Sequence, residues 1–165
     1  MEVNPRSLLS VVARHFGLKC SSIEKRLQLQ KIIYLMQTKG LNLGYAFNWY
    51  KHGPYSQNLA DDAYAVLQAE REKYKATEKW RFNKSTRKQI KAFEDILSPY
   101  INNYRILELV ASIDYMNRVW GESSEEKDLV DKLLIRKERL IDGKPVTIPD
   151  IKTANTVWKQ LQEMN

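Results

Sequence analysis

Few side chains in this sequence could act as a nucleophile, a general base or a soft metal ligand. The chain has two histidines, His15 and His52, and one cysteine, Cys20. No His-x-x-x-His, Cys-x-x-Cys or Glu-x-x-His spacing occurs, so the sequence predicts no zinc or di-iron site. No Gly-x-Gly-x-x-Gly segment or Walker lysine loop occurs, so no nucleotide cradle is expected. We therefore predict no catalytic residue, no metal and no cofactor, and a protein that is not an enzyme.

Two of these residues have alternative roles. Cys20 lies close to His15 in the sequence, and a thiol beside a histidine is one arrangement for covalent catalysis. Such pairs are defined by geometry, and a small buried or half-buried thiol is the expected role. His52 lies between Lys51 and Gly53. It either titrates near neutral pH and binds an anion together with Lys51, or it is an exposed turn residue that caps a neighbouring carbonyl.

The positive charge of the chain is concentrated in one segment. The formal net charge is +7, and residues 71–91 carry nine basic and two acidic residues, which accounts for the whole excess. After Trp80-Arg81-Phe82, four cations are spaced i, i+3, i+4 and i+7, so on a helix they share one face: Lys84, Arg87, Lys88 and Lys91. Together with Arg81 they are the candidate nucleic-acid-binding residues. The alternative is a solvated helix face.

Composition indicates a soluble globular protein. The chain has 165 residues, of which 43% are hydrophobic and 28% are charged. No apolar run approaches the ~20 residues of a membrane-spanning helix. The N-terminus is acidic before it is apolar, unlike a signal peptide, and a single cysteine cannot form an internal disulfide. We expect one domain over residues 1–165, with a helical C-terminal part from about residue 122, in the cytoplasm and without a membrane partner.

Capping residues and apolar periodicity predict about seven helices. A helix that is apolar on most sides is usually the centre of a bundle, and the second and fifth predicted helices have that character. The expected helices run from Asn4 to about Phe16, from a capping box at Ser21-Ser22-Ile23-Glu24 to Lys39, from Ser56 over about 20 residues, from Asn83 or Ser85 to before Pro99, from Tyr104 to Met116, from a capping box at Ser123 to about Leu140, and from Pro149 or Asp150 to about Met164.

Two segments have the character of strands. Residues 45–49 are rich in aromatic side chains, and residues 79–83 alternate polar and apolar types. We expect these two segments to pair as a small wing-like ribbon, and Gly53-Pro54 to form a turn. The predicted fold class is therefore mostly α, a compact bundle of about seven helices with a small two-stranded ribbon as an optional addition.

The segment around Gly53-Pro54 is the candidate protein-binding site. In an extended chain Trp49 and Tyr50 point to opposite faces, so one is expected in the core and the other at the surface. An exposed aromatic residue next to a basic one is a common anchor of protein interfaces. The candidate protein-binding residues are Trp49, Tyr50, Lys51, His52 and Tyr55.

The order of four motifs resembles the Panacea domain, a family of bacterial, archaeal and phage-associated proteins. The motifs are Leu29-Gln30-Lys31-Ile32-Ile33-Tyr34, Trp49-Tyr50-Lys51-His52-Gly53-Pro54-Tyr55, the following helix through Leu59 and Leu67, and Leu107-Glu108-Leu109-Val110-Ala111-Ser112-Ile113-Asp114-Tyr115. They cover about half of the chain. The basic excess and the C-terminal end from Lys144 do not match the family's pattern.

The resemblance implies a mostly helical fold with a helix-turn-helix or winged-helix character. It also implies an antitoxin or an adaptor, a protein that neutralises a partner protein by binding it and performs no chemistry. The partner expected first is therefore another protein, such as a cognate toxin. The alternative is a regulator that binds nucleic acid through residues 71–91, and the two roles are compatible.

Overall fold

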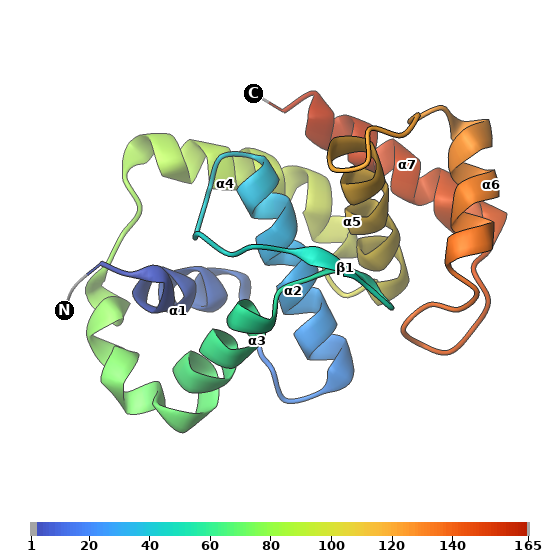
Figure 1. The fold of residues 1–165 in the computed structure, drawn as a ribbon. Helices are drawn as coiled ribbons and strands as arrows, with labels where there is room; N and C mark the ends of the chain where they lie inside the picture. Colours follow the sequence, from blue (N-terminus) through green and yellow to red (C-terminus); the bar gives the residue numbers. More distant parts are fainter. Residues whose placement is uncertain (1–2, 165) are drawn as a thin grey trace.

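Helices form most of the protein. The computed structural model describes residues 3–164, so Met1, Glu2 and Asn165 lie outside it. Within that range the regular elements are α1 (Pro5–Phe16), α2 (Ile23–Thr38), β1 (Asn48–Tyr50), β2 (Gly53–Tyr55), α3 (Gln57–Tyr64), α4 (Lys84–Leu97), α5 (Tyr104–Arg118), α6 (Glu126–Arg136) and α7 (Ile148–Gln162) (Figure 1). A π-helical turn (Ala65–Ala69) and a 3₁₀ helix (Arg71–Lys79) follow α3, and a short 3₁₀ turn (Ser98–Tyr100) follows α4. The predicted fold class, a helical bundle with a small ribbon, is confirmed.

Side-chain caps begin six of the helices. In each, the cap oxygen accepts a hydrogen bond from the backbone N–H three residues later, and the capping residues are Asn4, Ser22, Ser56, Asn83, Asn103 and Thr147. These bonds satisfy N–H groups that have no partner inside the helix, which is why such residues mark helix starts. The cap of α2 is Ser22 rather than Ser21, and Lys25 stands where a capping box needs Glu or Gln, so the predicted capping box does not form.

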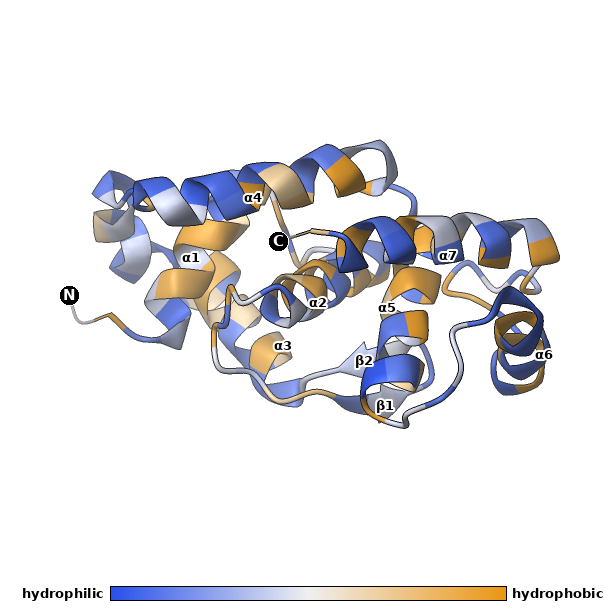
Figure 2. Ribbon diagram, turned by 90° about the horizontal axis from the view of Figure 1, so that it is seen from above, coloured by the Kyte–Doolittle hydropathy of each residue, from blue (hydrophilic) through white to orange (hydrophobic). Residues whose placement is uncertain are grey.

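The core is built around α2 and α5. Ten consecutive residues of α2, from Leu27 to Met36, and eleven of α5, from Ile106 to Met116, are buried. The C-terminal helix α7 packs along α5 and also contacts α4 and α6. In both views α1 lies at one end of the molecule and α6 at the other (Figures 1 and 2). Because other elements surround α2 and α5, both helices carry apolar side chains on most of their faces.

The predicted ribbon has the wrong partner strand. β1 pairs with β2 in an antiparallel hairpin closed by Lys51 and His52, so Gly53 and Pro54 lie in a strand and not in the turn. Lys79 ends the 3₁₀ helix, and residues 80–83 form no strand. A two-residue connection closes with a far smaller loss of chain entropy than the long loop that the predicted pairing requires.

The long helix predicted after Ser56 is also interrupted. α3 ends at Tyr64, and the chain continues through the π-helical turn into the 3₁₀ helix. Three residues per turn place Tyr74 and Thr77 on the same face, and both are buried. The Thr77 hydroxyl donates to Ser10 Oγ at 3.1 Å and accepts from Arg14 at 2.7 Å. Contacts with α1 therefore override the α-helical preference of this segment.

The sixth helix departs from prediction at both ends. α6 begins after Glu125 without a side-chain cap, so the capping box predicted at Ser123 does not form. It ends at Arg136 rather than near Leu140, because Lys137 adopts an extended backbone conformation and its side chain turns inward. The last helix begins at Ile148, with Thr147 as its cap.

Candidate functional site

A buried carboxylate joins the hairpin to the segment after α6. Glu108, on α5, is fully buried and accepts hydrogen bonds from Lys137 Nζ at 3.0 Å and from the Ile141 backbone N–H at 2.9 Å. Its Oε1 also lies 3.2 Å from His52 Nδ1. Burial alone would raise the pKa of Glu108, but the bonds and charges of His52 and Lys137 outweigh it, so the pKa lies below its usual range.

A second buried cation binds the backbone of the hairpin. Lys31, on α2, is 1% exposed and donates from Nζ to the Pro54 carbonyl oxygen at 2.6 Å. Burial disfavours its charged form, and the positive charge of Lys137 acts in the same direction, so the pKa of Lys31 falls to about 7. Burial likewise lowers the pKa of Lys137, although Glu108 opposes the effect.

Two features favour glycine at position 53: its backbone conformation, and the close approach of its Cα to α5. Its φ is +86°, a region that L side chains rarely adopt. A Cβ atom at this position would lie 2.5 Å from Ser112 Oγ on α5, so the Ser112 side chain or the hairpin would have to move. The hairpin therefore sits directly against α5 with no space between them, which holds the turn residues in place.

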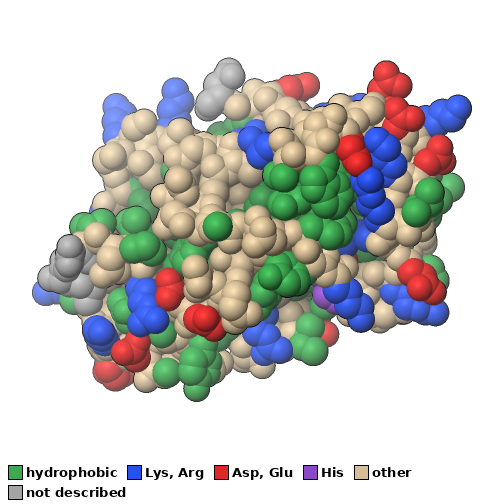
Figure 3. Space-filling model, in the orientation of Figure 1, with side chains coloured by type: hydrophobic (Ala, Val, Ile, Leu, Met, Phe, Trp, Pro, Cys, Tyr) green, Lys and Arg blue, Asp and Glu red, His purple; other side chains and the backbone are tan. Residues whose placement is uncertain are grey.

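Aromatic rings lie beside this buried network. The Trp49 ring is 4.8 Å from that of Trp120 and 5.7 Å from that of Tyr115, between centroids. The Arg136 guanidinium lies 4.9 Å from the centre of the Trp120 ring, while Lys137 Nζ lies 5.1 Å from that of Trp49. Both distances are within the range of cation–π attraction. Figure 3 shows hydrophobic side chains bordered by Lys and Arg on the face where β1 lies.

A basic cavity opens next to the rings, between the hairpin turn and the segment after α6. Its volume is about 570 Å³. Its lining contains one acidic side chain, Glu138, and five basic ones: Lys51, His52, Arg136, Lys137 and Arg139. We call this cavity, together with Tyr50 and Trp120, the hairpin site. Tyr50 is 51% exposed and Trp120 is 40% exposed, so two large aromatic surfaces face solvent at its rim.

The structure brings together most of the candidate protein-binding residues. Trp49 is half-buried and Tyr50 is exposed, as their alternation predicted. Lys51 and His52 line the cavity of the hairpin site. Tyr55 packs edge-on against Tyr50, at 5.3 Å between ring centroids, but lines a different cavity, beside α2 and α3.

Sequence reasoning missed the residues that complete the hairpin site. Trp120 follows α5, Arg136 is the last residue of α6 and Arg139 follows that helix, so all three are far from the hairpin in sequence. Glu108 is a charged residue within an apolar segment, and a charge at a core position is a signal of a buried polar contact. Lys137 lies in a run of four charged residues, 136–139, and gives no such signal. The partner of such a charge is set by the fold alone.

The basic segment forms two separate surfaces. On α4, Lys84, Arg87, Lys88 and Lys91 are exposed opposite the buried Ile90, Phe93 and Leu97, as the spacing predicted. Lys91 pairs with Asp95 at 2.6 Å, and among residues 3–164 the other three cations have no ion-pair partner. Trp80, Phe82 and Arg81 line a groove of about 450 Å³ between α1 and α4, with Arg87 and Lys91 on its α4 side.

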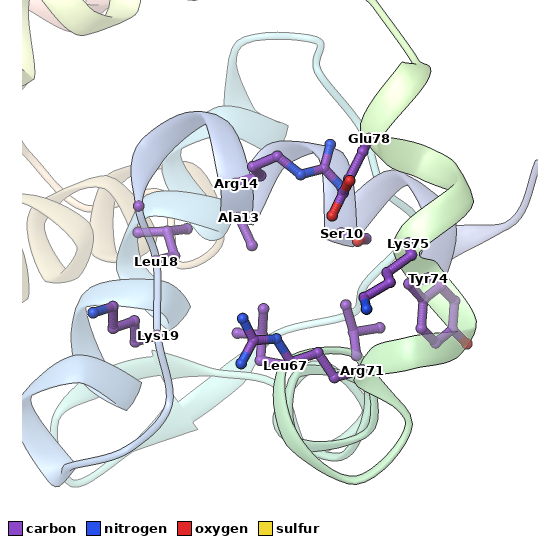
Figure 4. Close-up of a pocket in the computed structure, with 12 residues that line it drawn as sticks. Ser10, Ala13, Arg14, Leu18, Lys19, Leu67, Arg71, Tyr74, Lys75 and Glu78 are labelled. Atoms are coloured by element: carbon purple, nitrogen blue, oxygen red, sulfur yellow. The ribbon is translucent and has the colours of Figure 1, made fainter.

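Arg71 and Lys75 of the 3₁₀ helix line another cavity, of about 400 Å³, between that helix and the end of α1. Figure 4 shows Arg71 extending from the 3₁₀ helix toward the side on which Lys19 lies. Lys75 pairs with Glu72 at 2.6 Å, and Arg14 donates to the Thr77 carbonyl oxygen at 3.1 Å. The nine basic residues of the segment therefore do not form one continuous stripe.

Cys20 and His15 do not form a nucleophile–base pair. Cys20 is buried, and its Sγ lies 3.8 Å from the carbonyl oxygen of Ala63, while burial raises the pKa of its thiol. His15 Nε2 lies 2.8 Å from a carboxylate oxygen of Glu94 on α4. Within residues 3–164 no cluster of three or more His, Cys, Asp or Glu side chains is arranged to hold a metal ion.

Comparison with known proteins gave no relative: no protein-family model, no curated protein and no solved structure matches this chain. The Panacea resemblance therefore remains a prediction from the sequence. No helix in the described part of the chain has both the length and the apolar character needed to cross a membrane.

Proposed function

We propose that this protein is a non-catalytic binding module that neutralises or delivers a partner protein by direct contact, as an antitoxin or an adaptor does. The observation that supports this most is the exposed aromatic and basic surface of the hairpin site. Tyrosine, tryptophan and arginine are the residues that most often dominate binding energy at protein interfaces. Here Tyr50 and Trp120 are exposed, and the Arg136 guanidinium lies over the Trp120 ring. The Panacea resemblance favours the same role.

The polar groups beneath the hairpin site also favour binding over chemistry. Both carboxylate oxygens of Glu108 accept hydrogen bonds from the protein itself, and Lys137 donates to one of them. A buried group with all its partners inside the fold is held in place and has little capacity left for a substrate. We therefore assign this network the task of fixing the shape of the hairpin site.

The experiment is co-expression with each neighbouring gene. A neighbouring gene that arrests growth alone should be tolerated when the wild-type protein is present, and the two proteins should elute as one complex. The double variant Tyr50→Ala/Trp120→Ala should lose rescue and complex formation. Tyr64→Ala is the matched control, because Tyr64 is 58% exposed but lies on α3, away from the hairpin site. Absence of any toxic neighbour, or full rescue by the double variant, contradicts the proposal.

A second candidate function is nucleic-acid binding by α4 and the α1–α4 groove. Exposed cations along one helix face can follow a phosphate backbone, and aromatic side chains offer surfaces on which bases stack. The groove combines both features, because Trp80 and Phe82 line it beside Arg87 and Lys91. The two candidate functions use different surfaces, so one protein is able to carry both.

A further inference from the structure

The hairpin exposes one of its two strand edges. Its register pairs Asn48 with Tyr55, Trp49 with Pro54 and Tyr50 with Gly53. Proline has no N–H, so the central pair cannot be one that exchanges two hydrogen bonds. In an antiparallel ladder the bonded pairs then lie on either side of it, and the N–H and C=O of Trp49 point away from β2.

The opposite edge is closed by the body of the protein. The Pro54 carbonyl points away from β1 and accepts the hydrogen bond from Lys31, and Gly53 lies against Ser112. α2 and α5 contact β2, and in Figure 2 β2 lies between β1 and α2. Among residues 3–164 none donates to the Trp49 carbonyl or accepts from its N–H. β1 is therefore the outer strand.

An unpaired strand edge is a template for another strand. Because β1 has only three residues, a third strand would gain few backbone hydrogen bonds, and most of its affinity must come from side chains. The surroundings supply such contacts. Tyr50 and Trp120 offer apolar surface. Of the four lysines and arginines that line the cavity at the turn, Arg136 is ion-paired with Glu122 and Lys137 with Glu108, while among residues 3–164 Lys51 and Arg139 have no ion-pair partner. This charge favours an acidic strand.

We propose that the partner protein inserts an extended acidic segment along the outer edge of β1, as a third strand of the hairpin sheet. Alternate side chains of the segment face opposite ways. Side chains on the Trp49 face of the enlarged sheet contact Trp120, and those on the opposite face contact Tyr50. Carboxylates near the turn lie close to Lys51 and Arg139. This inference depends on the proposed function and specifies how the partner is recognised.

The test uses synthetic eight-residue peptides in which glutamate alternates with isoleucine or phenylalanine. The controls are the same peptides with lysine in place of glutamate, and with N-methyl groups on alternate amides. Calorimetry gives the affinity, and NMR of ¹⁵N-labelled protein follows the Trp49 amide. We expect the acidic peptides to bind at low salt and to slow hydrogen exchange at Trp49. The lysine and N-methylated peptides should bind at least roughly tenfold more weakly, since they lack the charge or the donors.

Charge-reversal variants locate the peptide. Lys51→Glu and Lys51→Glu/Arg139→Glu should weaken binding progressively, by roughly tenfold for the pair. Lys84→Glu/Lys88→Glu makes the same charge change on α4 and should leave the affinity unchanged. The single variant at the exposed Lys51 keeps the test valid if the double variant unfolds. The inference is wrong if no acidic peptide binds, if the N-methylated peptides bind equally well, or if Trp49 stays unprotected in the bound state.

The two proposals fail in different ways. If a toxic partner binds through Tyr50 and Trp120 while the Trp49 amide still exchanges freely, only the added strand is wrong. If the acidic peptides bind and protect Trp49 but no neighbouring gene is toxic, the docking mode stands and the antitoxin role is wrong.

Discussion

The Nζ atom of the buried Lys31 lies 2.6 Å from the carbonyl oxygen of Pro54. This bond joins the central helix α2 to the inner strand of the hairpin, and it uses a carbonyl that has no partner in the ladder. It thereby holds β2 against the core and leaves β1 at the surface. The same lysine carries a charge that burial disfavours, which makes the bond sensitive to pH.

Lys31 should make stability rise with pH above neutrality. Its pKa in the folded protein is about 7, whereas an unfolded lysine titrates near its ordinary value. Between these values the unfolded chain holds a proton that the folded protein has released, so the free energy of unfolding increases with pH. Urea denaturation at pH 7, 8 and 9 should show this increase in the wild type relative to Lys31→Met, on the order of 1 kcal/mol per pH unit. A constant difference between the two proteins contradicts the prediction.

Substitution of Gly53 should destabilise the protein through two separable effects. Gly53→Ala places a non-glycine residue at φ +86° and its Cβ 2.5 Å from Ser112 Oγ. The conformation costs about 1–2 kcal/mol and the overlap about 1–3 kcal/mol. Thermal denaturation of Gly53→Ala, Ser112→Ala and the double variant should show that Ser112→Ala recovers the steric part only. Purely additive effects of the two changes would rule out the contact as a cause.

Removal of the Glu108 charge should destabilise the protein at neutral pH but much less in acid. Glu108→Gln leaves Lys137 buried without a counter-ion, which costs about 3–5 kcal/mol. Because the pKa of Glu108 is lowered in the folded state, its contribution is present above its ordinary pKa and is lost as the pH falls through the folded value. Denaturant titrations from pH 7 to pH 3 should therefore converge for wild type and variant. Glu138→Gln, at an exposed neighbouring position, is the control and should change little.

If nucleic acid binds to the α4 surface, we expect its affinity to depend steeply on salt concentration. Binding to short duplex and single-stranded DNA, measured at low and moderate salt, should weaken as salt rises, because phosphate contacts release counter-ions. Arg87→Glu/Lys88→Glu should abolish binding to every sequence. Lys127→Glu/Lys144→Glu changes the charge equally at exposed positions elsewhere and should have a smaller effect. Binding that persists in about 0.5 M salt and in the α4 double variant would exclude this surface.

Local sequence signals were sufficient for most helices. Asn4, Ser56 and Asn83 mark helix starts because each side chain bonds to a backbone N–H three residues away, within one turn. The alternation of Trp49 and Tyr50 likewise depends only on the geometry of an extended chain. Local signals failed where contacts with distant residues set the conformation. The 3₁₀ helix is held by contacts with α1, and for this segment the local signals predicted an uninterrupted α-helix.

The amino-acid sequence by itself determined the helical class, the apolar character of α2 and α5, and the cationic face of α4, because these follow from side-chain types at fixed spacing. The tertiary structure decided which strand pairs with β1, that Glu108 holds Lys137 and the Ile141 N–H, and that Trp120 and Arg136 join the hairpin. Such contacts join residues far apart in the chain. Their partners depend on how the helices pack, which no local pattern encodes.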